Sequence, residues 1–316
     1  MKRRDFLKTT ALTAVAGTLP GALAHAEETV WKTKLKKAMI TKYPTEDTLT
    51  LWKRNGFTGC ESTDWSCGPE KAAEARKVAD RLGMEIHSVM RAWTNVNGPS
   101  FDSDVESMEC ALQTAQGYGA NAVLWVPCRT GGTLPKPTDF QIDFDPETLR
   151  VTRVVAGDNT PYKDYIDAQN LATQTTLAAV KKLIPMAEKT GVVIGLENVW
   201  NNLWVLPDFF AALVKSFKSP WVQGYFDIGN HVRYAAPEKY IYALGSDIIK
   251  LHVKDFAFAP DEPNCGKFCG LRQGSVNWPV VRKAIEDVGY NGYMTLECGG
   301  EIGDLSRLLD DIIAGK

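Results

Sequence analysis

Short apolar runs alternate with longer amphipathic stretches along most of the chain. The short runs are rich in Val, Ile, Leu and aromatic residues and have almost no polar interruption, which is typical of strands buried on both faces. In the longer stretches apolar residues recur every three or four positions, which predicts helices. We expect strands near residues 35–42, 57–62, 85–90, 122–127, 192–198, 222–228, 248–254 and 292–297.

The intervening helices are expected near residues 45–55, 69–82, 102–118, 165–190, 207–217, 237–245, 277–288 and 302–314. Glycine follows four of these stretches, as it often does after the last helical turn, and proline stands near the start of four, where it fits best. The glycines are Gly56, Gly83, Gly191 and Gly289, and the prolines are Pro69, Pro207, Pro237 and Pro279.

Eight strand–helix units predict an α/β fold: a single-domain (β/α)8 TIM barrel with parallel strands. No glycine-rich phosphate fingerprint follows the first strand, which argues against an open dinucleotide-binding sheet. Two long connections, 128–164 and 257–275, follow the fourth and seventh strands, so both should lie at the face that carries active sites in barrels. The first is a candidate lid or specificity loop, or equally a surface insertion.

The N-terminus has the pattern of an export signal. A twin-arginine motif, KRRDFLK at 2–8, precedes a short apolar run and a small-x-small cleavage site at 24–26. We therefore divide the chain into a signal peptide, 1–26, and a barrel, 27–316, and expect export in the folded state to the periplasm. The apolar run is too short to span a bilayer stably, and no other run approaches 18 apolar residues, so no membrane association is expected after signal removal.

Charge and cysteine content narrow the possible partners. The chain carries 36 basic and 38 acidic residues, and because the first 26 residues have a net charge of +3, the remainder is about −5. An acidic chain without a basic cluster argues against nucleic acid as a partner. The seven cysteines fit no zinc-finger spacing. Cys60, Cys128 and Cys298 are expected to be buried thiols, whereas Cys265 and Cys269 could form a disulfide in a periplasmic loop.

Four potential metal ligands close four successive strand-like runs. They are Glu197, Asp227, His252 and Glu297. Taken singly, the histidine could be a core residue, the aspartate a helix cap, and the last glutamate the partner of a lysine. In a barrel, however, the strand ends converge, so one divalent ion explains all four side chains together. Three carboxylates and one imidazole suit Mn²⁺, Mg²⁺, Co²⁺ or Zn²⁺.

Five segments around these residues resemble the xylose-isomerase-like sugar isomerases and epimerases, in particular the D-tagatose 3-epimerase-like enzymes. The segments are GLENVWN (195–201), YFDIGNHVRY (225–234), IKLHVKDF (249–256), GSVNWP (274–279) and GYMTLE (292–297). The resemblance implies that the four strand-end residues bind one divalent ion, most often Mn²⁺. It also implies that Glu197 and Glu297 flank the substrate and act as the catalytic acid/base pair.

Six further residues are candidates for substrate binding. Glu61 and His87 are predicted to end the second and third strands, although core packing is an equal alternative for His87. Lys254 follows His252 by two positions and could bond a substrate oxygen or pair with a carboxylate. Trp200 could stack on a sugar ring or pack at the barrel rim.

The last two candidates, Asn230 and His231, mark a departure from the resembling epimerases. Those enzymes often carry a histidine three residues after the metal-binding aspartate, where this chain has Asn230, and His231 comes one later. Relatives also commonly have Gly-Glu-Gly where this chain has Arg272-Gln273-Gly274. Neither difference affects the four metal ligands, but both leave the identity of the substrate undetermined.

Together these observations predict a divalent-metal-dependent isomerase or epimerase. Its substrate would be a non-phosphorylated sugar or keto-sugar, and the reaction would pass through an enediolate. A keto-glycoside lyase with the same site and a non-catalytic sugar-binding barrel are the alternatives, and a homodimer is possible. A nuclease on the same fold would need many histidines and a basic face, whereas only His87, His231 and His252 follow the signal.

Overall fold

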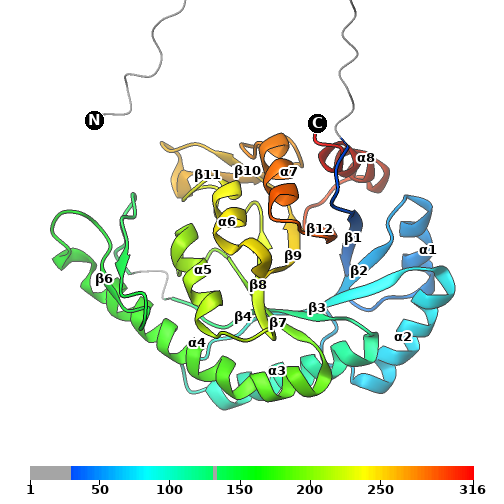
Figure 1. Cartoon of the computed structure of the whole chain (residues 1–316), viewed down its shortest axis with the longest axis horizontal. Coiled ribbons are helices and arrows are strands. Elements are labelled where there is room, and N and C mark those ends of the chain that lie inside the picture. Colours follow the sequence, from blue (N-terminus) through cyan, green and yellow to red (C-terminus); the bar gives the residue numbers. More distant parts are fainter. Residues whose placement is uncertain (1–29, 131–133) are drawn as a thin grey trace, which may run out of the picture. The chain divides into compact units, whose positions relative to one another are not determined.

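A computed structural model describes residues 30–130 and 134–316 of the chain. Within this part, eight parallel strands close into a barrel in the order β1-β2-β3-β4-β7-β8-β9-β12, surrounded by helices (Figure 1). The predicted barrel and all eight predicted strands are confirmed. The strands are β1 (Leu35–Thr41), β2 (Gly59–Ser62), β3 (Glu85–Trp93), β4 (Ala122–Val126), β7 (Val193–Glu197), β8 (Val222–Asp227), β9 (Ile248–Val253) and β12 (Gly292–Leu296).

Eight α-helices of the described residues alternate with these strands, and each falls on a predicted helical stretch. Gly83 and Gly191 end two of them in the left-handed conformation, with φ of 64° and 69°, which glycine adopts without strain. The helices are α1 (Glu46–Arg54), α2 (Pro69–Leu82), α3 (Phe101–Tyr118), α4 (Lys163–Thr190), α5 (Pro207–Ser216), α6 (Pro237–Leu244), α7 (Trp278–Asp287) and α8 (Ile302–Ile313).

The two long connections contain more regular structure than the apolar pattern predicts. The first holds a small antiparallel pair, β5 (Asp143–Phe144) and β6 (Val151–Arg153), and a 3₁₀ turn, η1 (Thr160–Tyr162). The second holds a hairpin of β10 (Asp255–Phe258) and β11 (Gly266–Cys269). Pairing within each loop satisfies backbone N–H and C=O groups that would otherwise depend on water. Short 3₁₀ turns also occur at η2 (Gly245–Asp247) and η3 (Pro263–Cys265).

Several expectations concern residues outside the barrel strands. The predicted signal peptide lies outside the described residues. None of the described helices is long and apolar enough to cross a membrane. All seven cysteines fall in the described part and are free thiols: Cys60 and Cys128 are buried as expected, Cys298 is half-buried, and Cys265 and Cys269 are not bridged.

The start of the barrel is held against its end by Glu286 on α7. Its carboxylate accepts hydrogen bonds from the backbone N–H of Lys32 (2.7 Å), from the backbone N–H of Thr33 (3.0 Å) and from the Thr33 hydroxyl (2.6 Å). Nearby, the Trp31 indole donates to the carbonyl of Ala314 at 3.1 Å. The hydrogen bonds from Thr33 and Lys32 lower the pKa of Glu286 to about 2.

Glu286→Gln is expected to lower the free energy of unfolding at pH 7. A carboxyl whose pKa is depressed by folding stabilises the fold above its unfolded pKa of about 4.3, and this contribution is lost as pH falls through about 2. Urea unfolding at pH 7 and at pH 3 measures the difference between variant and wild type, which should shrink at the lower pH. Glu188→Gln, at an exposed glutamate of α4, is the control. A difference that stays constant with pH would contradict this role.

Candidate metal centre

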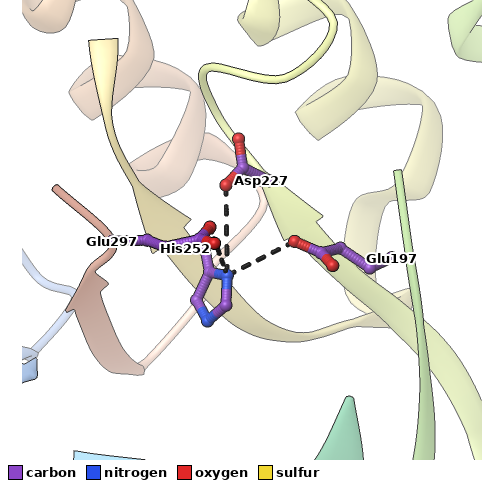
Figure 2. A group of neighbouring side chains, drawn as sticks. All are labelled: Glu197, Asp227, His252 and Glu297. Carbon is purple, nitrogen blue, oxygen red and sulfur yellow. Dashed lines mark ion pairs between the residues drawn. The ribbon is translucent and has the colours of Figure 1, made fainter. Parts of the chain in front are cut away.

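The four predicted metal ligands come from four consecutive strands of the barrel. Glu197 and Asp227 are the last residues of β7 and β8, His252 is the second-to-last of β9, and Glu297 directly follows β12. The order β12-β9-β8-β7 places these strands side by side. Their side chains point toward one another inside the barrel mouth (Figure 2), and one ligand atom from each lies within 4.8 Å of the others.

The imidazole Nδ1 of His252 is the centre of this cluster. It lies 3.3 Å from Glu197 Oε1, 3.2 Å from Glu297 Oε2 and 3.9 Å from Asp227 Oδ2. The atom is buried and has no hydrogen-bond partner among the described residues. An imidazole nitrogen can donate at most one proton, so it cannot satisfy three carboxylates. A cation shared by all four groups can.

The other nitrogen of His252 is held by a buried carboxylate. Glu61 Oε2 lies 2.7 Å from His252 Nε2 and also accepts a 2.7 Å hydrogen bond from the Tyr225 hydroxyl, which lies 3.0 Å from Ser88 Oγ. In a neutral imidazole, a carboxylate at Nε2 keeps the proton there and leaves the lone pair at Nδ1 facing the cluster, as a metal-binding histidine needs. Tyr225 is absent from the sequence-based candidates, although its position two residues before Asp227 puts it on the same strand face.

Asp227 divides its two oxygens between the backbone and the cluster. Oδ1 accepts hydrogen bonds from the N–H of Gly229 (2.9 Å) and Asn230 (2.6 Å), so Asp227 does cap the turn that follows it. Oδ2 faces the cluster. The side chain of Asn198 brackets the same residue, accepting from Asp227 N at 2.7 Å and donating to Asp227 O at 2.9 Å. Asn198 is a second positioning residue absent from the sequence-based candidates.

Lys254 supplies part of the positive charge that the cluster needs. Its Nζ lies 2.8 Å from Glu297 Oε2 and 3.2 Å from Asp227 Oδ2, which confirms the predicted pairing with a carboxylate. Three ionised carboxylates and one neutral imidazole carry three negative charges, and Lys254 reduces this to two. One divalent cation would balance the two charges that remain on these five side chains, which favours their burial together.

The pKa values of the clustered carboxyl groups also indicate that the site needs a further positive charge. Burial raises the pKa of Glu197 and raises that of Asp227 to about 7. Burial also raises the pKa of Glu297, but the contacts of its carboxylate with His252 and Lys254 outweigh burial and hold that pKa below its usual range. Buried carboxylates with raised pKa values retain protons unless further positive charge is present.

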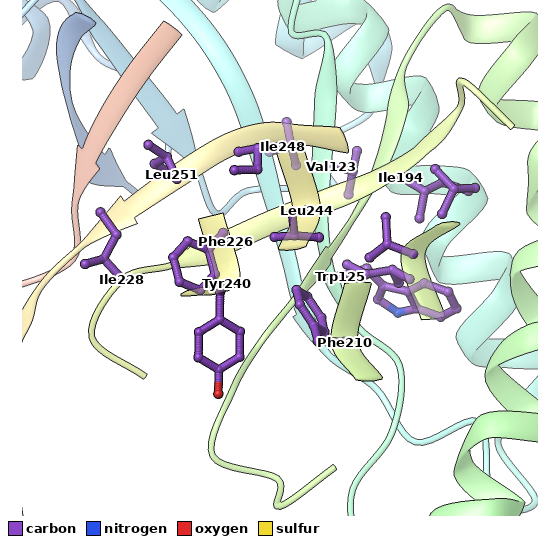
Figure 3. Packing of buried hydrophobic residues seen from close by; sticks show 14 of the residues in the cluster. Val123, Trp125, Ile194, Phe210, Phe226, Ile228, Tyr240, Leu244, Ile248 and Leu251 are labelled. Carbon is purple, nitrogen blue, oxygen red and sulfur yellow. The ribbon is translucent and has the colours of Figure 1, made fainter. Parts of the chain in front are cut away.

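Packing behind the cluster fixes the strands that carry it (Figure 3). Phe226 of β8 points away from the barrel axis and stacks on Tyr240 of α6, with ring centroids 5.5 Å apart. Other fully or almost fully buried residues of β4, β7 and β9 form the same core, among them Val123, Ile194 and Leu251. Alternation along each strand therefore places apolar side chains against the helices and the ligands inside the barrel.

His87 lies elsewhere than predicted. Strand β3 continues to Trp93, so His87 is its third residue and the expectation that it ends the strand is wrong. The three residues beyond the predicted strand, RAW (91–93), include a charged and a small residue, which the apolar pattern does not count as strand. The imidazole is buried, stacks on Tyr293 at 4.3 Å and lies 3.1 Å from Thr295 Oγ1. Burial lowers its pKa well below the usual value, which keeps it neutral.

The remaining candidates connect the loops after β7 and β8. Asn230 Nδ2 donates to Asn198 O at 2.9 Å, His231 Nε2 lies 2.9 Å from Val199 O, and the Trp200 indole donates to Asn230 O at 2.6 Å. These bonds give all three residues a positioning role. Direct contact of substrate with them, or with Glu61, stays a prediction.

Glu61→Gln is expected to weaken divalent-metal binding by about 10- to 100-fold, the usual effect of losing the partner of a metal-binding histidine. The amide of glutamine cannot stabilise the Nε2–H tautomer as a carboxylate does. Metal titration of the apoprotein measures the change. Tyr225→Phe, which keeps Glu61 but removes one of its donors, should have a smaller effect. Equal metal affinity in Glu61→Gln and wild type would contradict the assignment.

Solved structures similar to this chain share the same barrel. A D-tagatose 3-epimerase-like protein is 16% identical with a TM-score of 0.65, covering 88% of this chain and 97% of that one. A 3-keto-D-glucoside 4-epimerase from E. coli is 13% identical with a TM-score of 0.62, covering 89% and 99%. A xylose isomerase-like TIM barrel protein from Mycobacterium smegmatis in complex with magnesium is 18% identical with a TM-score of 0.57, covering 85% and 87%.

At these identities the likeness shows the fold alone. No curated protein matches the chain in sequence. The family described as xylose isomerase-like TIM barrel matches residues 49–311, which span α1 to α8 and include every residue of the cluster. The chain therefore belongs to the xylose isomerase-like TIM barrel family.

Proposed function

We propose that this protein is a divalent-metal-dependent isomerase or epimerase that acts on a non-phosphorylated sugar or keto-sugar. The main support is the position of two glutamates. The four ligands come from the adjacent strands β7, β8, β9 and β12, and a glutamate lies at each end of this series. Glu197 on β7 and Glu297 after β12 both approach His252 Nδ1, at 3.3 and 3.2 Å. A substrate bound over the cluster would therefore have a carboxylate on either side, as proton transfer between two faces or two carbons requires.

The cluster fits a single divalent cation, held by Glu197, Asp227, His252 and Glu297. Mn²⁺ is our first choice because of the resemblance to D-tagatose 3-epimerase-like enzymes, and the magnesium complex of a structurally similar protein makes Mg²⁺ the next. When bound, the ion would polarise a carbonyl and its neighbouring hydroxyl and stabilise the enediolate that proton loss creates.

The protein's own residues would move the proton and orient the sugar. One of Glu197 and Glu297 would take the proton from the carbon next to the carbonyl, and the other would return a proton to the opposite face or to the adjacent carbon. Lys254, whose Nζ lies 2.8 Å from Glu297 Oε2, would donate a hydrogen bond to a substrate oxygen near that glutamate. Glu61 and Asn198 would keep His252 and Asp227 in place during the reaction.

Hydrogen exchange tests the reaction whichever product is formed. The metal-loaded protein is incubated in D₂O with a panel of keto-sugars and 3-oxidised glycosides, and deuterium at the carbon next to the carbonyl is followed by NMR. Incorporation with at least one compound is the expected result. No incorporation with any of them would favour a non-catalytic sugar-binding barrel instead.

A keto-glycoside lyase is the second candidate. The structural likeness to a 3-keto-D-glucoside 4-epimerase favours oxidised glycosides among the substrates. Proton loss next to a 3-keto group followed by departure of the C1 substituent would need the same base and the same ion. The products separate the two activities, because an epimerase keeps the glycosidic bond and a lyase releases the alcohol.

Export is the remaining part of the proposal. The twin-arginine motif at 2–8 supports transport of the folded protein to the periplasm. Sugar phosphates are made inside the cell, so this location favours a free or oxidised sugar as substrate. A reporter fused to residues 1–30 should be exported only when Arg3 and Arg4 are both present, and export of the double lysine variant would contradict the route.

A further inference from the structure

Three aromatic rings pack against one another beside the metal centre and form a cluster that we call the aromatic shelf: Trp200, Phe256 and Phe268. The Phe268 ring centroid lies 5.0 Å from that of Trp200 and 5.4 Å from that of Phe256, in tilted and edge-on arrangements. Phe256 is fully buried, whereas Phe268 is 44% exposed. The Phe268 ring is therefore exposed to solvent, while the Phe256 ring beneath it is packed in the interior.

The hairpin that carries Phe268 is firmly anchored. Phe256 and Phe268 are cross-strand partners of β10 and β11, so their side chains share one face of the hairpin. Asp255, buried at its start, accepts hydrogen bonds from Phe256 N (2.8 Å), Val276 N (3.3 Å) and the Trp278 indole (3.1 Å). The exposed ring is therefore held in place by the fold, as a binding surface needs.

The shelf begins where the metal centre meets solvent. Lys254 Nζ lies 5.1 Å from the centroid of the Phe268 ring and 2.8 Å from Glu297 Oε2, so one ammonium group separates the ring from the cluster. The Glu297 side chain is 35% exposed, whereas those of Asp227 and His252 are fully buried and that of Glu197 is 7% exposed. The exposed ring of Phe268 therefore lies on the same side of the cluster as Glu297, its most exposed ligand.

We propose that the aromatic shelf binds the second ring of a glycoside, so that the preferred substrate is an oxidised glycoside with an aromatic or sugar substituent rather than a free monosaccharide. The inference rests on the proposed function. A single keto-sugar ring with its carbonyl oxygen at the cluster would leave Phe268 exposed to water, whereas a second ring on the Lys254 side would cover it. Aromatic faces stack well on other aromatic rings and on the apolar face of a pyranose. Lys254 would lie between the two rings, within reach of the oxygen that joins them.

The test compares substrates that differ only in the second ring. Phe268→Ala is expected to lower kcat/KM for phenyl 3-keto-β-D-glucoside by about 10-fold, the size of one lost aromatic stacking contact, and to leave that for 3-keto-D-glucose unchanged. The matched control is Phe258→Ala, which removes a ring of similar exposure, 42%, two residues beyond Phe256 on β10. Phe258→Ala should leave kcat/KM unchanged for both substrates.

Calorimetric binding of phenyl β-D-glucoside and of methyl β-D-glucoside separates this inference from the proposed function, because these unoxidised glycosides have no free carbonyl and undergo no reaction. Tighter binding of the phenyl glucoside that disappears in Phe268→Ala supports the shelf even if no deuterium exchange is found. Equal binding of the two sugars by wild type, or an equal loss for both in Phe268→Ala, overturns the shelf even if exchange occurs.

Discussion

Asp227→Ala and His252→Ala are each expected to reduce divalent-metal content from about one ion per chain to none after dialysis. Loss of one ligand from a four-residue site should exceed the roughly 100-fold effect of losing an outer partner. Elemental analysis of the purified proteins measures the metal content.

Two further variants keep this prediction decisive if the alanine variants fold poorly. Asp227→Asn retains the oxygen that caps Gly229 and Asn230 and removes only the charge that faces the cluster. Asp255→Asn is the matched control, since Asp255 is equally buried just beyond the end of the neighbouring β9 but bonds backbone and indole N–H groups. Metal retained in Asp227→Asn and in both alanine variants would show that the cluster is not a metal site.

Thermal unfolding provides an independent measure of the same site. A ligand at 100 times its Kd stabilises the folded state by about 2.7 kcal/mol, so a chelator should lower the Tm of the wild type. It should leave the Tm of Asp227→Asn unchanged. An unchanged wild-type Tm at chelator concentrations that remove the metal would indicate that the ion contributes nothing to the fold.

Glu197→Gln and Glu297→Gln are expected to lower the rate of deuterium exchange into the best keto-sugar by about 10²- to 10⁴-fold, the usual contribution of a general acid or base. Glutamine keeps an oxygen that can bind an ion but cannot carry a proton at neutral pH. Exchange is measured at saturating metal, with metal content determined on the same samples. A loss of exchange at full metal occupancy then reports proton transfer and not metal loss.

Glu85→Gln is the control for these two changes. Glu85 also belongs to the barrel, but it begins β3 at the end opposite the metal centre and bonds Lys36 and Tyr293. The exchange rate of this variant should match that of the wild type. If both cluster variants retain exchange at the wild-type rate, the two glutamates bind the ion without moving the proton, and another group must act as the base.

Much of the fold was predictable because its signals are local. The runs VVIGL and YMTL are almost entirely apolar, as expected of strands that are covered on both faces. Gly83 and Gly191 mark helix ends, where they adopt the left-handed conformation. The metal ligands were predictable for a related reason. A charged residue that closes a buried strand needs a partner, and parallel strands in a barrel end at the same face.

Roles that depend on contacts between distant segments were not predictable in this way. Glu61 and Tyr225 are 164 positions apart, and only closure of the barrel brings both to His252. His87 is also a histidine in a strand, but its position near the start of β3 stacks it on Tyr293 and keeps it out of the metal cluster. Strand register decides this height, and register follows from pairing with neighbours that are remote in sequence.

By itself, the amino-acid sequence determined the barrel of eight strand–helix units and the identity of the four clustered residues. Both follow from local signals, namely the apolar periodicity of each segment and the charged or imidazole side chain near the end of a buried strand. The tertiary structure alone decided which nitrogen of His252 faces the cluster, that Lys254 offsets part of the cluster's negative charge, and that the β10–β11 hairpin holds Phe268 beside Lys254. These features arise from distances between segments that only the closed, packed barrel brings together.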